Sequence, residues 1–453
     1  MQFRKVISGI VLGVFVLFSA HSPVFGAGAP ANDELLKELR EMRELIAEQN
    51  ERIKELEQKV SGQQHKIDSH SEAIEKENLQ DISGRMKNEL ERLKNIGGLE
   101  IGGGITFVGQ GTPNANNGDA TDGEDSRFDG SWSADVEIAR EFDDFGMAFL
   151  HMESGQGDTV EGELSLFSNV NRDAGDTGAN VQITEAWYEH YFFDKQVTIT
   201  AGKIDATSYM DTNEFANDEC TQFLGHIFRN SAVIDWPDDN NWGGRLYIAP
   251  EVLPFLDLEA VFMEEDGDWE NLFDNPFIAA QLNFMPAAAF DYDEGIWGGN
   301  YRVLFWYNGA PHAKVKNPDE IERGDVGFGF SFDQKITDVY GIFGRFGWAD
   351  PTKSDMGYDW SVGGQMIGRC WNREEDVVAA AIGQAIPGKD HRGMNEFGKA
   401  ETHIEAYYAF KVNDHLTLSP DMQIIWDANG GGTANGRDPD TIFVYGIRGQ
   451  IDF

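Results

Sequence analysis

The sequence predicts an all-β transmembrane barrel of about sixteen antiparallel strands, preceded by an N-terminal α-helical coiled coil. Three observations lead to this prediction. From residue 99 onward, segments of about ten residues alternate apolar and polar side chains, as strands between lipid and a polar lumen do. The connections between these segments are alternately short and long. Before residue 95, apolar residues instead follow a heptad spacing.

The clearest strand signal lies in residues 441–453. Large apolar side chains share one parity, namely Phe443, Tyr445, Ile447, Ile451 and Phe453. Polar side chains share the other parity, namely Arg448, Gln450 and Asp452. An ordinary half-buried strand shows the same alternation. An apolar row that ends on an aromatic residue, however, resembles the last strand of a bacterial outer-membrane barrel.

The other candidate segments have the length that a tilted membrane strand needs, about ten residues. They lie near 100–109, 131–142, 146–154, 182–193, 196–204, 242–250, 256–264, 277–285, 299–309, 325–334, 338–348, 358–368, 376–386, 402–412 and 415–426. A soluble β-sandwich also alternates, but the connection 143–145 is short whereas 155–181 and 205–241 are long and polar, as in a membrane barrel. The connections at 286–298 and 369–375 are longer than usual turns. A barrel of this size leaves an aqueous channel, so we expect passive permeation.

Composition limits the partners. With 36 Lys and Arg against 78 Asp and Glu, the formal net charge is -42, which argues against nucleic acid or anionic lipid as a partner and favours cations or neutral solutes. Outside the N-terminal leader, no apolar run is long enough for a transmembrane helix. Cys220 and Cys370 are too few for a disulfide framework, a zinc site or haem attachment. We therefore expect no cofactor and no metal.

The N-terminus has the parts of a secretory signal peptide. Arg4 and Lys5 precede an apolar stretch, and small residues follow around Gly26, where we expect cleavage; an uncleaved anchor is the alternative. The chain is then exported. The predicted domains are a signal peptide at 1–27, a periplasmic coiled-coil stalk at 33–95 and an outer-membrane barrel at 99–453.

The stalk prediction rests on aliphatic residues at every seventh position, namely Leu39, Ile46, Ile53, Val60, Ile67 and Ile74. Polar Gln49, Gln63 and His70 interrupt the second apolar position of the heptad. A single amphipathic helix on a domain surface is the alternative, but so narrow a stripe over about six heptads needs partner helices. We expect self-association, and a homotrimer by analogy with membrane barrels more than from the heptads themselves.

Two stretches carry a family resemblance. Residues 184–237 contain TEAWYEHYFF, VTITAGKIDAT and DTNEFANDECTQFLGHIFRN, and residues 415–431 read HLTLSPDMQIIWDANGG. They resemble the carbohydrate-selective, OprB-like porins, in which a GK-D segment precedes a long acidic loop and a Pro-x-x-Gln strand precedes a glycine-rich loop. The resemblance implies an outer-membrane porin for small hydrophilic solutes, with carbohydrates as the expected class. Outer-membrane lipid and lipopolysaccharide would surround it. The heptad stalk is not part of that pattern.

Strand parity predicts which side chains face the lumen. Glu185, Trp187 and Glu189 share one parity, and this alternation of acid and aromatic suits neutral sugars because carboxylates accept hydroxyl hydrogen bonds and aromatic faces contact sugar C–H groups. The reverse phase would put Trp187 and Tyr191 in an interfacial aromatic belt instead. Further candidates on lumen parity are Arg302, Arg345, Glu405, Asp421 and Gln423.

The connection 205–241 is too long to be idle surface, so we expect it to fold inward and narrow the pore. Its candidate residues are Asp205, Tyr209, Asp211, Asn213, Glu214, Asn217, Asp218 and Glu219. Acidic side chains of this kind can bind Ca²⁺, but DTNEFANDE lacks the glycine and the final glutamate of a calcium loop.

Other function classes find little support in the sequence. The histidines are scattered, no serine lies in a nucleophile elbow, and Cys220 with His226 has no independent support as a catalytic pair, so we do not expect an enzyme. An electron-conduit sheath would need a separate haem partner, because the chain has no CxxCH motif. A general cation-selective porin without sugar specificity is the main alternative.

Overall fold

The computed structural model describes residues 98–116, 126–173, 178–237, 240–267, 269–270, 273–394, 398–431 and 441–453, together with helical Arg52, Lys54 and Lys59. The predicted signal peptide lies outside the described residues, as does the predicted coiled coil except for those three positions. The chain divides into two compact units, Met1–Glu89 and Leu90–Phe453, and the second contains all the strands described below.

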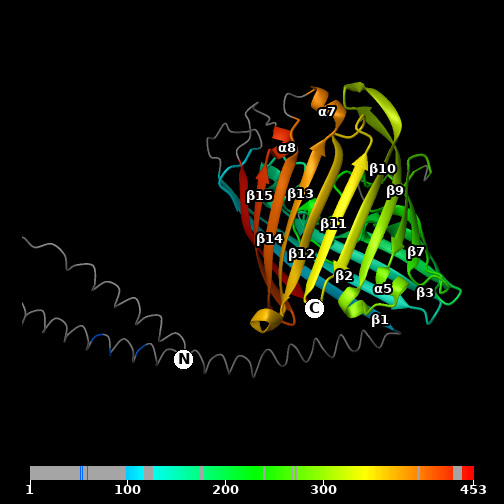
Figure 1. Ribbon diagram of the computed structural model, residues 1–453, viewed down its shortest axis with the longest axis horizontal. Coiled ribbons are helices and arrows are strands. Elements are labelled where there is room, and N and C mark those ends of the chain that lie inside the picture. The colour runs from blue at the N-terminus through cyan, green and yellow to red at the C-terminus, as the bar shows by residue number, and fades with distance from the viewer. Residues whose placement is uncertain are drawn as a thin grey trace, which may run out of the picture. The chain divides into compact units, whose positions relative to one another are not determined.

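The second unit is a closed antiparallel barrel of sixteen strands (Figure 1). The strands are β1 (Leu99–Thr112), β2 (Arg127–Glu141), β3 (Gly146–Gln156), β4 (Gln182–Phe192), β5 (Val197–Ile204), β6 (Asn241–Ile248), β7 (Leu256–Glu264), β8 (Pro276–Phe284), β9 (Gly299–Lys314), β10 (Asn317–Lys335), β11 (Tyr340–Ala349), β12 (Met356–Gly368), β13 (Arg373–Pro387), β14 (Glu401–Asn413), β15 (Leu416–Trp426) and β16 (Ile442–Asp452). They follow one another around the barrel in chain order. This confirms the predicted barrel, and each predicted segment overlaps one strand.

The barrel closes where β16 pairs with β1. The register runs from Gly104 opposite Asp452 to Gly111 opposite Tyr445. Thr106 and Gln450 are hydrogen-bonded through their side chains across this pair, inside the barrel. Because the ladder is continuous, the barrel has no open sheet edge, which a bilayer would not tolerate.

Side chains alternate between the two faces of the wall as predicted, most clearly on β9. Phe305 is 62% exposed on the outer face, with Tyr307 beside it, whereas Arg302 and Trp306 are buried inside at 8% and 3%. β10 and β14 follow the same alternation. The outer face is therefore an apolar belt and the inner face a mixture of polar and apolar side chains.

The two ends of the barrel differ, as Figure 1 shows. The short helices α7 (Lys389–Met394) and α8 (Ala428–Gly431) lie at the end that carries most of the long connections. The C-terminus and α5 (Pro286–Phe290) lie at the opposite end. The unusually long turn that the sequence indicated at 286–298 holds α5 and α6 (Glu294–Trp297), and the turn after β12 holds the 3₁₀ helix η4 (Arg369–Trp371).

Two predicted segments, near 299–309 and 325–334, are shorter than the strands that contain them. The spacing of the apolar residues left 310–324 as a loop, but β9 and β10 continue through it to a tight turn between Lys314 and Asn317. Lys314 holds the extension by ion pairs with Glu320 and Glu322, each at 2.6 Å. Because residues 317–323 are exposed, this part of the hairpin lacks the apolar alternation that marks a strand in the wall.

The interior is packed where long connections fold against the wall. One cluster joins Phe215, Phe223 and Phe228 from the β5–β6 connection to Phe343 and Tyr407 of the wall. Another joins Val160 and Val170 from the β3–β4 connection to β15 and β16. Within the part of the chain that the structure describes, no helix is long and apolar enough to span a membrane.

The outer apolar belt makes a testable prediction. Phe305→Arg places a cation on the lipid face near the middle of β9 and should lower the free energy of unfolding by about 2–4 kcal/mol, the cost measured for such substitutions at the bilayer midplane. Ile321→Arg is the matched control, because Ile321 is 57% exposed on the projecting hairpin, where a charge should cost about 0.5 kcal/mol or less. Urea unfolding in lipid vesicles measures both. Equal losses would contradict the assignment of the outer face.

Candidate functional site

The connection between β5 and β6 lies inside the barrel, as its length led us to expect. It begins with the 3₁₀ helix η3 (Ala206–Ser208), where the Asp205 carboxylate accepts the Thr207 backbone N–H at 2.8 Å, and it contains α4 (His226–Arg229). The Phe223 ring contacts Tyr407 of β14 edge to face, with ring centroids 5.1 Å apart. The connection therefore packs against the wall on the side of β11 to β14.

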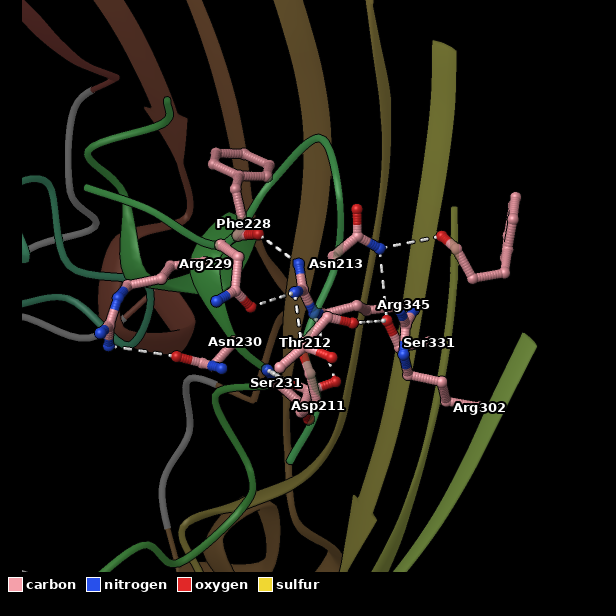
Figure 2. Close-up of polar contacts among 12 residues, drawn as sticks. Asp211, Thr212, Asn213, Phe228, Arg229, Asn230, Ser231, Arg302, Ser331 and Arg345 are labelled. Atoms are coloured by element: carbon pink, nitrogen blue, oxygen red, sulfur yellow. Dashed lines mark hydrogen bonds and ion pairs between the residues drawn. The ribbon is translucent and has the colours of Figure 1, made fainter. Parts of the chain in front are cut away.

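A buried ion pair fixes this connection to β11 (Figure 2). Arg345 is 3% exposed and Asp211 is 2% exposed; the Arg345 Nε lies 3.3 Å from Asp211 Oδ1. The same guanidinium donates to the backbone carbonyls of Asp211 at 2.9 Å and Phe228 at 2.5 Å. Asp211 Oδ2 accepts the Ser231 N–H at 2.6 Å. One wall arginine thus joins the start of the connection to α4, and Asp211 joins it to Ser231 just after that helix.

Asn213 ties the connection to β10. Its Nδ2 donates to the Phe332 carbonyl at 2.9 Å and to Ser331 Oγ at 3.3 Å (Figure 2). The next residue, Glu214, forms an ion pair with Lys335 at 2.9 Å. Because Asn213 is buried, its amide needs these partners to offset the loss of water.

Wall carboxylates hold the backbone of the connection. Glu405 accepts the N–H groups of Leu224 at 2.6 Å and Gly225 at 2.9 Å through its two oxygens. Asp359 accepts the Ala232 N–H at 2.5 Å and the Ser231 hydroxyl at 2.8 Å. These carboxylates satisfy N–H groups that would otherwise be buried without a partner.

The β3–β4 connection, which contains the 3₁₀ helix η2 (Thr159–Glu163), is held in the same way. Glu401 of β14 accepts the N–H groups of Phe167 at 2.9 Å and Ser168 at 2.8 Å. The Gln423 amide donates to the Val170 carbonyl at 2.9 Å. Two connections therefore occupy one side of the lumen.

The other side of the lumen is open. A cavity of about 900 Å³ lies between the inner faces of β1 to β5 and the two inward connections. Nine carboxylates line it: Asp135, Glu137, Glu153, Asp173, Glu185, Asp205, Asp218, Glu219 and Asp452. The cationic side chains are Arg172, Lys203 and Arg229, and the histidines are His151 and His226. Hydroxyl and amide groups and the indole of Trp236 complete the lining.

Burial shifts the pKa of several connection residues at this cavity. Burial raises the pKa of Asp173 to about 7, although the Ser133 hydroxyl that bonds to it acts in the opposite direction. Burial, reinforced by Arg172, Arg229 and Arg345, lowers the pKa of His226 well below its ordinary value, so the imidazole is neutral. The fixed positive charge of the connections therefore comes from arginine and not from histidine.

The structure separates the pore candidates that strand parity and the long connection 205–241 predicted. Of these sixteen, five line the cavity, namely Glu185, Asp205, Asn217, Asp218 and Glu219. Glu189 and Tyr209 lie instead with Arg245, which is 3.7 Å from the Glu189 carboxylate and 4.5 Å from the Tyr209 ring centroid. Trp187 is on the inner face, where it donates to Glu185 at 3.0 Å, so the alternative with Trp187 in an outer belt is wrong.

The remaining candidates hold the inward connections or the wall. Asp211, Asn213, Glu214, Arg345, Glu405 and Gln423 anchor connections through the contacts above. Arg302 pairs with Asp333 at 2.6 Å within the wall, and Asp421 accepts from Gln423 at 2.9 Å. Parity identifies a side chain that points inward, but it does not distinguish a side chain that faces water from one covered by a connection.

The sequence analysis did not name several residues that line the cavity. Asp135, Glu137, His151 and Glu153 fall on the inner parity of β2 and β3 and were open to the same argument. Asp173 and Arg172 had no such signal, because they belong to an irregular connection. Of the connection residues that the sequence indicated, Asn217, Asp218 and Glu219 do line the cavity. Among the described residues there is no cluster of ligands suited to a metal ion.

A sequence profile described as "Carbohydrate-selective porin, OprB family" matches residues 120–453. The chain belongs to this family. Porin AaxA of Chlamydia abortus is 20% identical over 309 residues, which cover 68% of this chain and 65% of that protein. Porin AaxA of Chlamydia caviae is 18% identical over 282 residues, which cover 62% of this chain and 59% of that protein. The chain thus spans less than two thirds of the length of either relative.

A solved structure supports the same fold. The high-pH structure of Pseudomonas putida OprB superposes with a TM-score of 0.66 at 17% identity, covering 80% of this chain and 96% of that one. The family match and this likeness agree on the barrel fold. The family resemblance inferred from 184–237 and 415–431 is confirmed.

The Arg345–Asp211 pair makes a prediction for this OprB-family barrel. Arg345→Met leaves the Asp211 carboxylate buried without its partner, which should cost about 3–5 kcal/mol and loosen the connection from β11. Single-channel conductance should rise, and a protease should cut within 205–240. Adding Asp211→Asn should restore part of the stability.

The exposed Arg369–Asp338 pair offers a matched control. Arg369→Met should leave both stability and conductance nearly unchanged, because exposed ion pairs contribute little. If both arginine variants behave alike, the pair with Asp211 does not hold the connection.

Two inward glycines of the wall test how closely the connection packs. A Cβ at Gly341 would lie 2.3 Å from the buried ring of Phe215, whereas a Cβ at Gly329 meets nothing closer than 3.8 Å. Gly341→Ala should therefore lower the free energy of unfolding by about 1–3 kcal/mol, while Gly329→Ala should change it by less than about 1 kcal/mol. Thermal unfolding in detergent measures the difference, and a costlier Gly329→Ala would refute the packing.

Proposed function

We propose that the protein is an outer-membrane porin for passive diffusion of small hydrophilic solutes, with carbohydrates as the principal class. The observation that carries this proposal is the polar cavity between β1–β5 and the inward connections. A volume of about 900 Å³ lies in the range of small-molecule sites. The connections narrow the lumen without filling it.

The lining suits neutral polyols. Carboxylates such as Glu185 accept hydrogen bonds from hydroxyl groups, and side chains such as Gln182 and Thr184 both donate and accept. The indole of Trp236 offers apolar surface for sugar C–H groups. Since each contact is weak and exchangeable with water, solutes bind and leave quickly, as permeation requires.

A general cation-selective porin is the second candidate. The observation that favours it is the excess of nine carboxylates over three cationic side chains around the cavity. Such a wall concentrates cations whether or not it recognises sugars. The two candidates differ in whether a neutral sugar obstructs the ion current.

Location and assembly complete the proposal. We infer that the barrel is surrounded by outer-membrane lipid and lipopolysaccharide, and that residues 33–95 form a periplasmic coiled coil through which the protein self-associates, as a homotrimer. The support for the coil is the heptad pattern of the sequence, whose residues lie almost entirely outside the described ones. Catalysis is not part of the proposal.

Planar-bilayer recordings separate the two candidates. A neutral monosaccharide or short oligosaccharide should reduce single-channel conductance saturably, with a dissociation constant of about a millimolar or weaker. Glu185→Gln should weaken the block several-fold, because an amide oxygen accepts a weaker hydrogen bond than a carboxylate. Asp319→Asn removes the same charge on the exposed tip of the β9–β10 hairpin and should leave the block unchanged.

Salt dependence supplies the other half of this experiment. A preference for K⁺ over Cl⁻ that declines at high salt reports the field of the carboxylates, because added ions screen it. If that preference is present and no sugar in the panel blocks the channel, the carbohydrate proposal fails and the general porin replaces it.

A further inference from the structure

Two carboxylates face each other on the cavity wall. Asp135 of β2 and Glu153 of β3 are register partners, and both side chains line the cavity. Like charges at directly opposite positions of an antiparallel pair are destabilising. Asp135 has a partner in His151, whose Nε2 is 3.2 Å away. Among the described residues, no hydrogen bond or ion pair reaches the Glu153 carboxylate.

A third carboxylate completes this face. Asp173 is 6% exposed and lines the same cavity. Its Oδ1 accepts from Ser133 Oγ at 2.8 Å and from Cys220 Sγ at 3.5 Å, whereas its Oδ2 has no partner in the described structure. Ser133 precedes Asp135 by two residues on the same face of β2, so Asp173 is anchored beside the Asp135–Glu153 pair. A buried carboxylate oxygen without a partner is costly unless a ligand supplies one.

Of the three cationic side chains around the cavity, two have other partners, and no ion pair in the described structure joins the third, Arg172, to Glu153 or Asp173. Arg229 forms an ion pair with Glu219, and Lys203 Nζ donates to the Ile183 carbonyl at 2.8 Å. The guanidinium of Arg229 and the ammonium of Lys203 are therefore engaged elsewhere. A solute that carries its own positive charge would compensate the Glu153 and Asp173 carboxylates together.

The groups around these carboxylates suit hydroxyls. Gln182 and Thr184 line the cavity from β4, and the indole Nε1 of Trp236 has no partner in the described structure. A polyol can accept a hydrogen bond from that N–H and donate to the carboxylates. A simple inorganic cation can do neither.

We propose that this cavity binds an aminated sugar or sugar alcohol, with its ammonium group against Glu153 and Asp173 and its hydroxyl groups toward Trp236 and β4. The inference rests on the proposed porin function and assigns its preferred solute class. Neutral sugars pass through the same cavity but bind it more weakly, because they leave the Asp173 Oδ2 with only a hydroxyl donor. An ammonium group supplies a charged one.

Three probes of conductance block test this in the full-length protein in planar bilayers. They are D-glucitol, which is a neutral polyol; N-methyl-D-glucamine, the matching polyol with an amine; and tetraethylammonium, a cation without hydroxyl groups. Measured at about pH 8, above the pKa of Asp173 that burial raises to about 7, the amine is protonated and this carboxylate is ionised. We expect N-methyl-D-glucamine to block about tenfold more tightly than either other probe, a factor that corresponds to about 1.4 kcal/mol.

Variants locate the site. Glu153→Gln and Asp173→Asn keep the shape of each side chain, and each should reduce the preference for the amine over D-glucitol to about twofold, while Asp319→Asn on the exposed hairpin should keep the full preference. The heat-dependent shift in electrophoretic mobility of folded barrels verifies that each variant has folded. If Asp173→Asn does not fold, Glu153→Gln alone still tests whether the ammonium group binds at these carboxylates.

The outcomes are distinct. Equal block by D-glucitol and N-methyl-D-glucamine overturns this inference and leaves the porin proposal intact. Equal block by N-methyl-D-glucamine and tetraethylammonium also overturns it, because the cavity would then respond to charge alone. If both carboxylate variants keep the preference for N-methyl-D-glucamine over D-glucitol, the ammonium group does not bind at Glu153 and Asp173. Absence of block by every polyol refutes the proposed carbohydrate function itself.

Discussion

Backbone hydrogen bonding inside a closed wall is the constraint on which the rest of this structure depends. A connection that folds into a barrel brings its N–H and C=O groups away from bulk water, and each needs a partner. Here the wall provides these partners. Glu401 accepts N–H groups of the β3–β4 connection. Glu405 and Asp359 accept N–H groups of the β5–β6 connection, and Arg345 donates to two carbonyls of that connection. Together with the apolar clusters around Phe223 and Val170, these side chains hold the connections inside the barrel.

This use of wall side chains divides the lumen. On the side of β10 to β15, charged groups are buried in contacts with the connections, and aromatic residues such as Phe223 fill the remaining space. On the side of β1 to β5, the carboxylates remain beside the open cavity. The same residue type thus has two roles, because a connection covers one part of the wall and leaves the other uncovered. The cavity therefore follows the uncovered part of the wall.

The excess of carboxylates at the cavity has a physical cost. Asp135 and Glu153 oppose each other, and Asp173 keeps one buried oxygen without a partner in the described structure. Such arrangements destabilise the protein unless water or a solute compensates them. Glu405, by comparison, has both oxygens bonded to backbone N–H groups and carries no such requirement. Asp421 on β15 also keeps one buried oxygen without a partner in the described structure, so this cost is shared by both sides of the lumen.

The sequence by itself determined the barrel, because the alternation of side chains has the period of the wall: a residue such as Phe305 must face outward wherever Arg302 faces inward. The length of the connection 205–241 also predicted that it folds into the lumen. The sequence did not determine the hairpin extension at 310–324, because residues 317–323 of that extension are all exposed and show no apolar period. Only the tertiary structure decided that Glu185 faces the cavity while Glu405 lies beneath a connection. Strand parity fixes the side of the wall on which a residue lies. Whether a connection covers that residue depends on contacts between residues far apart in the chain, such as Leu224 with Glu405.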